Sequence, residues 1–200
     1  MSKKPGTRSK SLALIGIMGA LGNVLAIISI SIGMIPSPIF GQVAFDFSNL
    51  AVAIVAVYAG WRLGLLTGLI AGLTSGIWFG PLGSLGILGL LGLPLGKALT
   101  GLTVGILSNP IRGNQDRRSP LLVIPIVLVG YLPEFVFTVY FFLALVPILI
   151  GGATAVYLLL ALPIIVVKAW IEMTAISFFM WILLHDRGFT NFIDGYLSRS

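Results

Sequence analysis

The chain has 200 residues, of which 58% are hydrophobic and only 9% are charged, and its formal net charge is +6 at pH 7. So little polar surface excludes a soluble domain of this size and predicts an integral membrane protein. The absence of cysteine excludes disulfides, thiolate metal sites and thiol nucleophiles. The cations lie at helix ends rather than on one face, which argues against nucleic acid as a partner.

Six apolar segments follow in chain order, and we expect each to cross the bilayer: 12–32, 48–59, 63–79, 85–107, 121–149 and 157–184. The first is too long for the core of a cleaved signal peptide, so we expect it to be retained. The second is short for a bilayer core of roughly 30 Å, which takes about 20 residues. We therefore expect it to cross obliquely or with help from the preceding loop, 33–44, where Pro36 and Pro38 disfavour helix.

The distribution of cations predicts the orientation of these segments. Lysine and arginine occur in the tail 1–11, at Arg62, in the loop 109–119 and in the polar tail 185–200, whereas the loops 33–44, 80–83 and 151–154 contain none. This is the positive-inside pattern, and it predicts cytoplasmic tails and a cytoplasmic 109–119 loop in a multi-pass protein of the cell membrane. The fold class that we expect is all-α: six transmembrane helices in a single domain, 1–200, with both termini cytoplasmic.

Asp46 stands at the entry to the short second segment, between Phe45 and Phe47. It is followed by Ser48 and Asn49, either of which is suited to cap a helix by accepting a bond from a free backbone N–H. A polar loop that dips towards the membrane ahead of a short helix indicates a binding pocket, with Asp46 near the outer interface. An ordinary helix cap at the headgroup level is the alternative.

Four ionisable residues lie inside apolar segments: Lys97, Glu134, Lys168 and Glu172. Charges within a membrane are costly and indicate function. Lys168 and Glu172 are four residues apart, so they share a helix face and can pair; a mutually neutralised pair without further role is the alternative. Lys97 and Glu134 need partners from other helices. We predict that all four turn inward around one polar cavity in the middle and outer half of the membrane.

Aromatic residues complete the predicted site. Phe40, Trp78 and Tyr131 are placed to stack on a flat ring or to hydrogen-bond a ligand, although an interfacial aromatic belt would use the same residue types. The residues that we expect to bind a substrate are therefore Phe40, Asp46, Asn49, Trp78, Lys97, Tyr131, Glu134, Lys168 and Glu172. We expect no metal, cofactor or catalytic residue, because HExxH, GxSxG and the nucleotide-binding GxxxxGK[ST] motif are all missing from the sequence.

Small residues follow one another at a spacing of four in the first segment, as at Gly16 and Ala20. Such a stripe leaves a smooth groove in which another helix can dock. The partner could be a second protein, or a helix of this same chain.

Taken together, these features resemble the substrate-binding S components of energy-coupling factor (ECF) vitamin transporters, with the riboflavin-type members closest. The resemblance covers all six segments, and its most specific part is Asp46-Phe47-Ser48 at the entry to the second segment. Pro163 and Lys168 keep the spacing of the family's sixth helix, but Asn49, Ala51, Ile164 and Ile165 depart from the riboflavin-type pattern. Glu134 and Glu172 are additional acids, which indicate a substrate with donors or a positive charge, or a different vitamin.

The resemblance implies a subunit that captures a vitamin-like molecule, riboflavin-like as a first guess, from outside the cell. Transport would then need a transmembrane coupling subunit and two ATPase subunits, and Gly16-Ile17-Met18-Gly19-Ala20 stands where the family's AxxxA docking motif lies. The loop from Pro36 to Asp46 would serve as a lid. The alternatives are a stand-alone secondary transporter that relays protons through Glu134 or Glu172, and a membrane enzyme, for which supporting motifs are missing.

Overall fold

The computed structural model describes residues 5–32, 34–37, 41–112 and 120–198 and is almost entirely helical over this part of the chain. The fold class is therefore helical, as predicted, with one small hairpin in addition. In chain order the elements are α1 (Pro5–Ile32), β1 (Met34–Ser37), β2 (Gly41–Ala44), α2 (Asn49–Ala59), α3 (Trp61–Ala71), α4 (Leu73–Phe79), α5 (Gly86–Leu107), α6 (Asn109–Arg112), the 3-10 helix η2 (Pro120–Leu122), α7 (Val123–Tyr140), the π-helix η3 (Phe141–Leu145), α8 (Val146–Leu149), α9 (Gly152–His185) and α10 (Arg187–Ser198).

Five stretches of the described chain are long and apolar enough to cross a membrane: Ser9–Ser31, Trp61–Phe79, Gly86–Leu107, Pro120–Leu149 and Gly152–His185. Many large apolar side chains on them are exposed, among them Ile17, Ile87 and Ile148. A water-soluble protein would bury such a surface, so the protein is membrane-embedded. As predicted from its length, α2 is a shorter apolar helix, of 11 residues.

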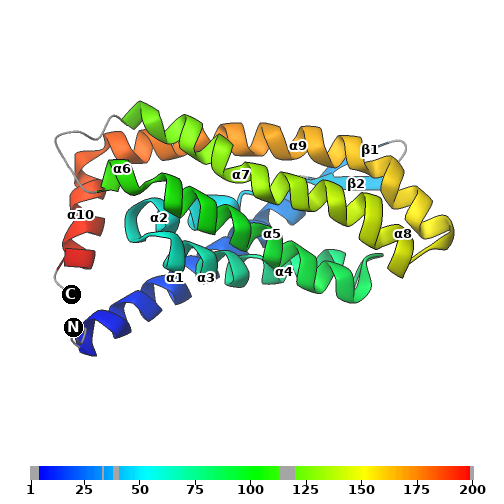
Figure 1. Ribbon diagram of the computed structural model, residues 1–200, viewed down its shortest axis with the longest axis horizontal. Coiled ribbons are helices and arrows are strands. Elements are labelled where there is room, and N and C mark those ends of the chain that lie inside the picture. Colours follow the sequence, from blue (N-terminus) through cyan, green and yellow to red (C-terminus); the bar gives the residue numbers. More distant parts are fainter. Residues whose placement is uncertain (1–4, 33, 38–40, 113–119, 199–200) are drawn as a thin grey trace.

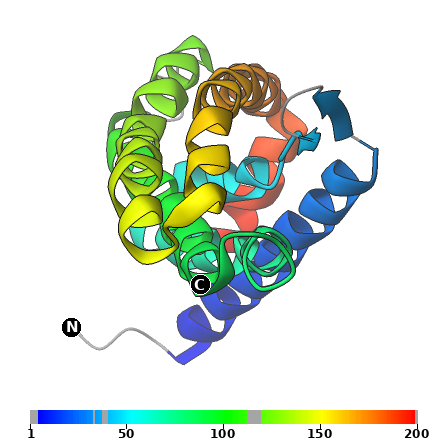
Figure 2. The same ribbon diagram turned by 90° about the vertical axis from the view of Figure 1, so that its right-hand side faces the viewer.

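The helices run back and forth along one long axis (Figure 1). The start of α1, α6 and α10 lie at one end of the bundle, and the β-hairpin and the turn between α8 and α9 lie at the other. Viewed from this second end, the helices surround α2, which lies in the interior (Figure 2). Consistent with that position, nearly every residue of α2 is buried.

A glycine stripe brings α3 and α4 against the backbone of α5. Every fourth residue on this face is glycine: Gly64, Gly68, Gly72 and Gly76. A Cβ added to Gly68 would overlap the Lys97 carbonyl oxygen, and one added to Gly72 would lie 2.5 Å from the Pro94 Cα. The backbones therefore meet directly, as small residues allow in membrane helix packing. This contact fixes the height and rotation of α5 and thus of Lys97.

The small residues of α1 divide between two faces. Gly19 and Gly22 pack on α3, because a Cβ on Gly19 would lie 2.6 Å from Ile70 and one on Gly22 would lie 2.5 Å from Ala71. Gly16 and Ala20 are exposed, and no atom lies within 4 Å of a Cβ added to Gly16. Part of the predicted docking stripe is thus used inside this chain, and the part at Gly16 and Ala20 is open.

The loop 33–44 was expected to be irregular, and its described residues instead form an antiparallel hairpin. Met34 pairs with Ala44, and Pro36 pairs with Gln42. Proline has no N–H to donate, but a strand in a two-stranded hairpin has an unpaired edge on which that loss is tolerated. The prolines exclude helix, as expected, without excluding a strand.

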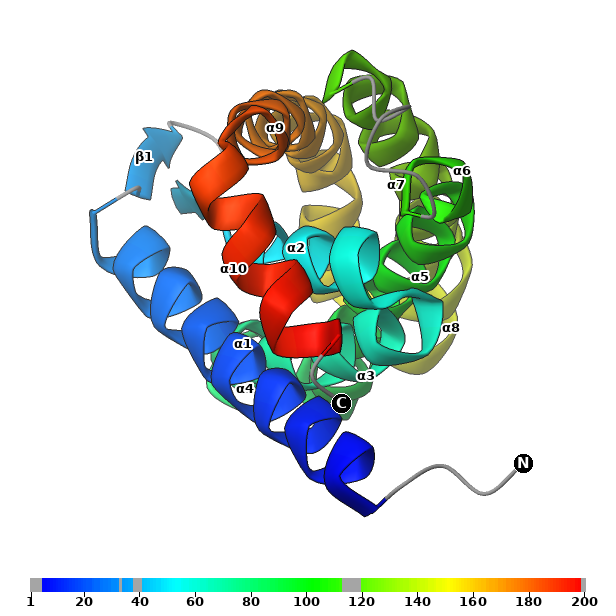
Figure 3. The same ribbon diagram turned by 90° about the vertical axis from the view of Figure 1, so that its left-hand side faces the viewer.

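The tail 185–200 was predicted only to be polar, and over its described part it forms the helix α10. This helix lies across the end of the bundle (Figure 3). Its apolar residues Phe189 and Ile193 pack on the core, and Thr190 hydrogen-bonds the Tyr58 hydroxyl at 3.0 Å. The polar residues that gave the tail its composition occupy the opposite face of an amphipathic helix. The tail 1–11 likewise becomes helical from Pro5, a residue suited to a first helical turn.

Arg112 joins the ends of α2 and α5. Its guanidinium donates to the carbonyl oxygens of Ala56 at 2.8 Å, Val57 at 2.9 Å and Gly105 at 2.9 Å. These carbonyls belong to last turns, which lack partners within their own helices. Gly60 leaves α2 with φ of 100° and lies directly beside the guanidinium, so a side chain there would be both strained and obstructed.

Candidate small-molecule site

A cavity of about 560 Å³ lies between α2, α4, α5, α7 and α9. Its volume is in the range of sites for drug-sized ligands, about 300–1,000 Å³. Eight of the nine residues predicted from the sequence line it: Asp46, Asn49, Trp78, Lys97, Tyr131, Glu134, Lys168 and Glu172. The ninth, Phe40, lies outside the described residues.

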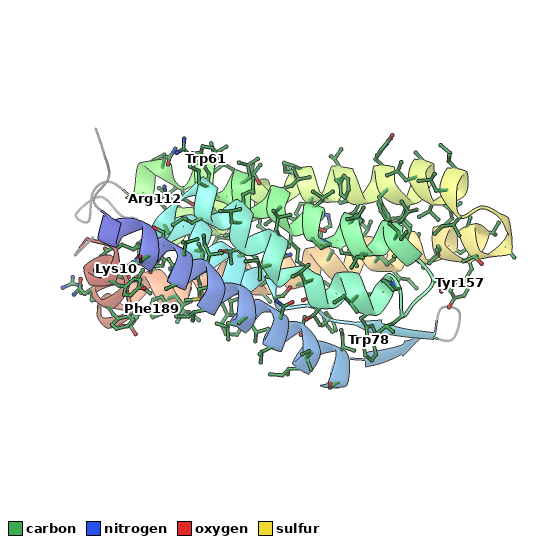
Figure 4. The ribbon with its side chains drawn as sticks, turned by 90° about the horizontal axis from the view of Figure 1, so that it is seen from below. Lys10, Trp61, Trp78, Arg112, Tyr157 and Phe189 are labelled. Atoms are coloured by element: carbon green, nitrogen blue, oxygen red, sulfur yellow. The ribbon has the colours of Figure 1, made fainter. Side chains whose placement is uncertain are left out.

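The charged part of the cavity lies far from both ends of the bundle. Lys97 is 11 residues beyond the start of α5, about 16 Å along the helix axis. Trp78 and Tyr157 also line the cavity, are partly exposed, and lie towards the end of the molecule opposite Lys10 and Phe189 (Figure 4). The cavity therefore leads from its charged interior towards the end that carries the β-hairpin.

Lys97 is the centre of a buried hydrogen-bond network. Its ammonium lies 2.6 Å from the Asp46 carboxylate and also donates to the hydroxyls of Ser48 and Ser75. The Ser75 hydroxyl in turn donates to the same carboxylate at 2.8 Å. Lys97 is only 4% exposed. A buried ammonium with a carboxylate and two hydroxyls has the partners that make burial of a charge tolerable.

The entry to α2 shows how Asp46 is positioned. The Ser48 backbone N–H donates to the Asp46 carboxylate at 3.0 Å, and the Ser48 hydroxyl, expected from the sequence as a possible helix cap, binds Lys97 instead. Burial by itself raises the pKa of Asp46, but the charge of Lys97 and the hydrogen bonds from Lys97 and Ser48 outweigh it and hold this pKa well below its usual range. Because it contacts Lys97, Asp46 lies deeper than the predicted position near the end of the bundle.

Lys168 and Glu172 form the predicted pair on one face of α9, with 3.1 Å between the ammonium and the carboxylate. Glu172 has a second partner, because its carboxylate accepts the backbone N–H of Asp46. This bond connects the entry to α2 with α9. The two ion pairs of the cavity are therefore adjacent and lie on opposite walls.

Glu134 is placed differently from the other acids. Its carboxylate accepts a hydrogen bond from the Thr100 hydroxyl of α5 and adjoins the amide of Asn49. No ammonium or guanidinium within the described residues forms an ion pair with it. Sequence analysis predicted that Glu134 needs a partner from another helix, and the partner supplied by the protein is a neutral hydroxyl.

Asn49 also has unused hydrogen-bonding capacity. Its side-chain nitrogen contacts the Met173 sulfur at 3.8 Å, and over the described chain its side-chain oxygen has no partner. The residue is only 8% exposed. An acceptor that is buried without a partner is uncommon in native proteins and calls for an explanation.

Several residues in the cavity lining or directly behind it were not singled out from the sequence. Ser75 binds Asp46 and Lys97, and Thr100 binds Glu134. Thr100 follows Lys97 by three positions, so it lies on nearly the same face of α5, and this spacing could have identified it. Phe142 lines the cavity from the π-helix η3, and no local sequence signal indicates that change of helical register.

The two residues predicted to dock a partner protein lie outside the cavity. Gly16 and Ala20 are on the outer surface of α1. Among the described residues no group of three or more His, Cys, Asp or Glu side chains is arranged to hold a metal ion.

What the described part of the site offers is a partly enclosed, mainly apolar space with two ion pairs and one further carboxylate. Such a space binds a small molecule through a few polar contacts. In comparisons with protein-family profiles, curated proteins and solved structures, the chain gives no significant match.

Proposed function

We propose that this protein is the substrate-binding subunit of an energy-coupling factor type importer, which captures a vitamin-like small molecule. The observation that carries the proposal is the cavity itself: residues far apart in the sequence, from Asp46 to Glu172, line one ligand-sized space deep in a bundle of apolar helices. A structural role for these charges alone would be served by a closed contact without a cavity.

The orientation that we propose places both termini in the cytoplasm and the mouth of the cavity outside the cell membrane. Lys10, Arg112 and Trp61, which is stacked with Arg62, lie at the end of the bundle where the chain starts and ends (Figure 4). The turns at the other end, 80–85 and 150–152, contain no lysine or arginine. This asymmetry supports six crossings, with α2 as the short one.

The proposed subunit would bind its substrate but not pump it. A transmembrane coupling subunit with two ATPase subunits would supply the energy, and the exposed surface of α1 around Gly16 and Ala20 is the proposed docking face. For coupling, the loaded and the empty protein must differ in affinity for that partner, since a ligand shifts an equilibrium only through differential binding.

Mass spectrometry of small molecules that co-purify with the protein tests the proposal most directly. We expect a single organic molecule at near-stoichiometric amounts, released by denaturation, and a yellow colour if it is a flavin. Glu134→Ala and Lys168→Ala should both lower its occupancy, whereas Gly16→Leu should not. Purification without any bound molecule, together with unchanged occupancy in both cavity variants, would contradict the proposal.

The proton-coupled secondary transporter is retained as the second candidate, because Glu134 is a half-buried carboxyl group inside an apolar helix, with a neutral hydrogen-bond partner. The two functions differ in what the chain does alone. In liposomes that contain only this protein, a binding subunit retains substrate stoichiometrically, whereas a secondary transporter accumulates it in response to a pH gradient.

A further inference from the structure

The charges that line the cavity do not balance. Among the described lining residues there are three carboxylates, Asp46, Glu134 and Glu172, and two ammonium groups, Lys97 and Lys168. Two of the carboxylates are in ion pairs, Asp46 with Lys97 and Glu172 with Lys168. Three minus two leaves one carboxylate, and that one is Glu134.

Glu134 is also the acid for which the protein supplies the weakest compensation. Its hydrogen bond comes from the uncharged Thr100 hydroxyl. Lys97 and Asp46 both act on it electrostatically, but with opposite sign, and they are already bound to each other. A carboxylate in a largely apolar cavity is costly to keep ionised without a bound cation, and a cationic ligand would lower that cost.

Asn49 lies next to this carboxylate and lines the cavity. Its amide N–H side acts on Glu134, whereas its side-chain oxygen has almost no accessible surface. Glu134 is therefore the acceptor that this part of the wall offers to a ligand. The two oxygens of a carboxylate match a ligand group that carries two N–H donors in one plane.

The rest of the lining favours a flat, aromatic ligand and disfavours an anion. Trp78, Tyr131, Phe142 and Tyr157 supply ring surfaces, which attract both aromatic rings and cations. An anionic ligand would need an available ammonium, but Lys97 is bound to one carboxylate and two hydroxyls, and Lys168 is bound to Glu172.

We propose that the ligand carries a planar, positively charged nitrogen group, such as an amidinium or a protonated amino-heterocycle, which binds the Glu134 carboxylate. This inference rests on the proposed function, because it takes the cavity to be a small-molecule site, and it names the chemical class of the molecule. The cation restores the charge balance of the cavity, and its N–H groups bind the carboxylate that has no cation among the described residues.

Three probes of nearly equal shape test this inference: benzamidine is a cation, benzamide is neutral and benzoate is an anion. Their affinities for the full chain in lipid nanodiscs are measured by isothermal titration calorimetry after endogenous ligand has been removed. We expect benzamidine to bind about tenfold or more tightly than benzamide, because charge-assisted hydrogen bonds are the stronger ones. Benzoate is expected to bind weakest.

Glu134→Gln keeps the shape of the side chain and removes its charge, so it should reduce the preference for benzamidine over benzamide to about twofold or less. Asp186→Asn is the matched control, since it removes one carboxylate at an exposed position at the end of α9, and it should keep the wild-type preference. If Glu134→Gln fails to fold, Glu134→Asp serves in its place: it keeps the charge but withdraws the carboxylate, and it should weaken benzamidine more than benzamide.

Three outcomes overturn the inference. If benzoate or benzamide binds the wild-type protein as tightly as benzamidine, the ligand class is wrong while the cavity remains a binding site. If none of the three binds, the inference also fails, and the co-purification experiment then decides separately whether the proposed function fails with it. A preference for benzamidine that Glu134→Gln leaves intact would show that another group selects the cation.

Discussion

The two walls of the cavity are built in different ways. On the wall formed by α2 to α5, half of the most apolar stretch of α5 is buried inside the protein, and its backbone meets that of α3 along the glycine stripe. On the opposite wall, formed by α7 and α9, only 22% and 11% of the corresponding stretches are buried. The first wall is thus two layers thick, and the second is a single layer with one side towards the cavity and the other exposed.

This difference extends to the charges that the walls carry. The thick wall holds Lys97 between Asp46 and two serine hydroxyls, a set that is complete without a ligand. The thin wall carries Glu134, whose partners among the described residues are the Thr100 hydroxyl and the Asn49 amide of the thick wall, both uncharged. We conclude that the thick wall defines the geometry of the site and that the thin wall offers the group with unused binding capacity.

The largest effect that we expect comes from breaking the network of the thick wall. Lys97→Met leaves the Asp46 carboxylate buried without its cation, which should lower the free energy of unfolding by about 3–5 kcal/mol. Chemical unfolding in bicelles measures this. The double variant Lys97→Met with Asp46→Asn should recover much of the loss, and additive losses would show that the two residues are not coupled.

Next in size is the effect of separating the two layers of that wall. Gly68→Val places a side chain against the Lys97 carbonyl oxygen, which is backbone and cannot move aside, and should cost about 1–3 kcal/mol. Gly16→Val is the matched control, because a Cβ there meets nothing, and its effect should stay within about 0.5 kcal/mol. Equal losses in the two variants would contradict the direct contact between α3 and α5.

A smaller effect is expected from the ion pair of the thin wall. Lys168 is partly exposed, with 18% of its side chain accessible compared with 5% for Lys97. Lys168→Gln should therefore reduce the free energy of unfolding by about 1 kcal/mol. If the loss matched that of Lys97→Met under the same conditions, the two walls would be equally dependent on their charges and the comparison would not hold.

The smallest expected effect concerns α10, which follows the thin wall in sequence but packs against Tyr58 of the thick wall. Thr190→Val removes the hydroxyl that bonds Tyr58 at 3.0 Å and should cost about 0.5–1.5 kcal/mol. Hydrogen exchange should become faster in α10 while α5 is unaffected. Faster exchange throughout the bundle would show that α10 is part of the core rather than an attachment to it.

Much of this architecture could be predicted from the sequence, because apolar composition and segment length are local properties. The charged residues of the cavity could be predicted for the same reason, since Lys97, Glu134 and Glu172 are conspicuous in apolar surroundings. Their pairing could not, because the bond between Lys97 and Asp46 joins residues 51 positions apart. The role of Ser48 could not be predicted for the same reason. Its hydroxyl is suited to cap α2, but it accepts a hydrogen bond from the ammonium of Lys97, which is distant in sequence.

Two further features, the glycine stripe and α10, could have been predicted from residue spacing in the sequence. The glycines at intervals of four in α3 and α4 predict a close helix contact as clearly as the small residues of α1 do. The apolar residues Phe189, Ile193 and Leu197 of α10 are likewise four apart and indicate an amphipathic helix. The periodicity was overlooked because the tail 185–200 is polar on average.

The bond from the Asp46 main chain to Glu172 has a mechanical consequence. Because the donor is main chain, only the side-chain torsions of Glu172 can follow a movement of α9, and the walls are held close together at this depth. Tyr157 lies 15 residues before Glu172 on α9, about 22 Å along the axis. A swing of α9 that preserves this bond therefore moves the helix least near Glu172 and most at Tyr157, where the opening lies.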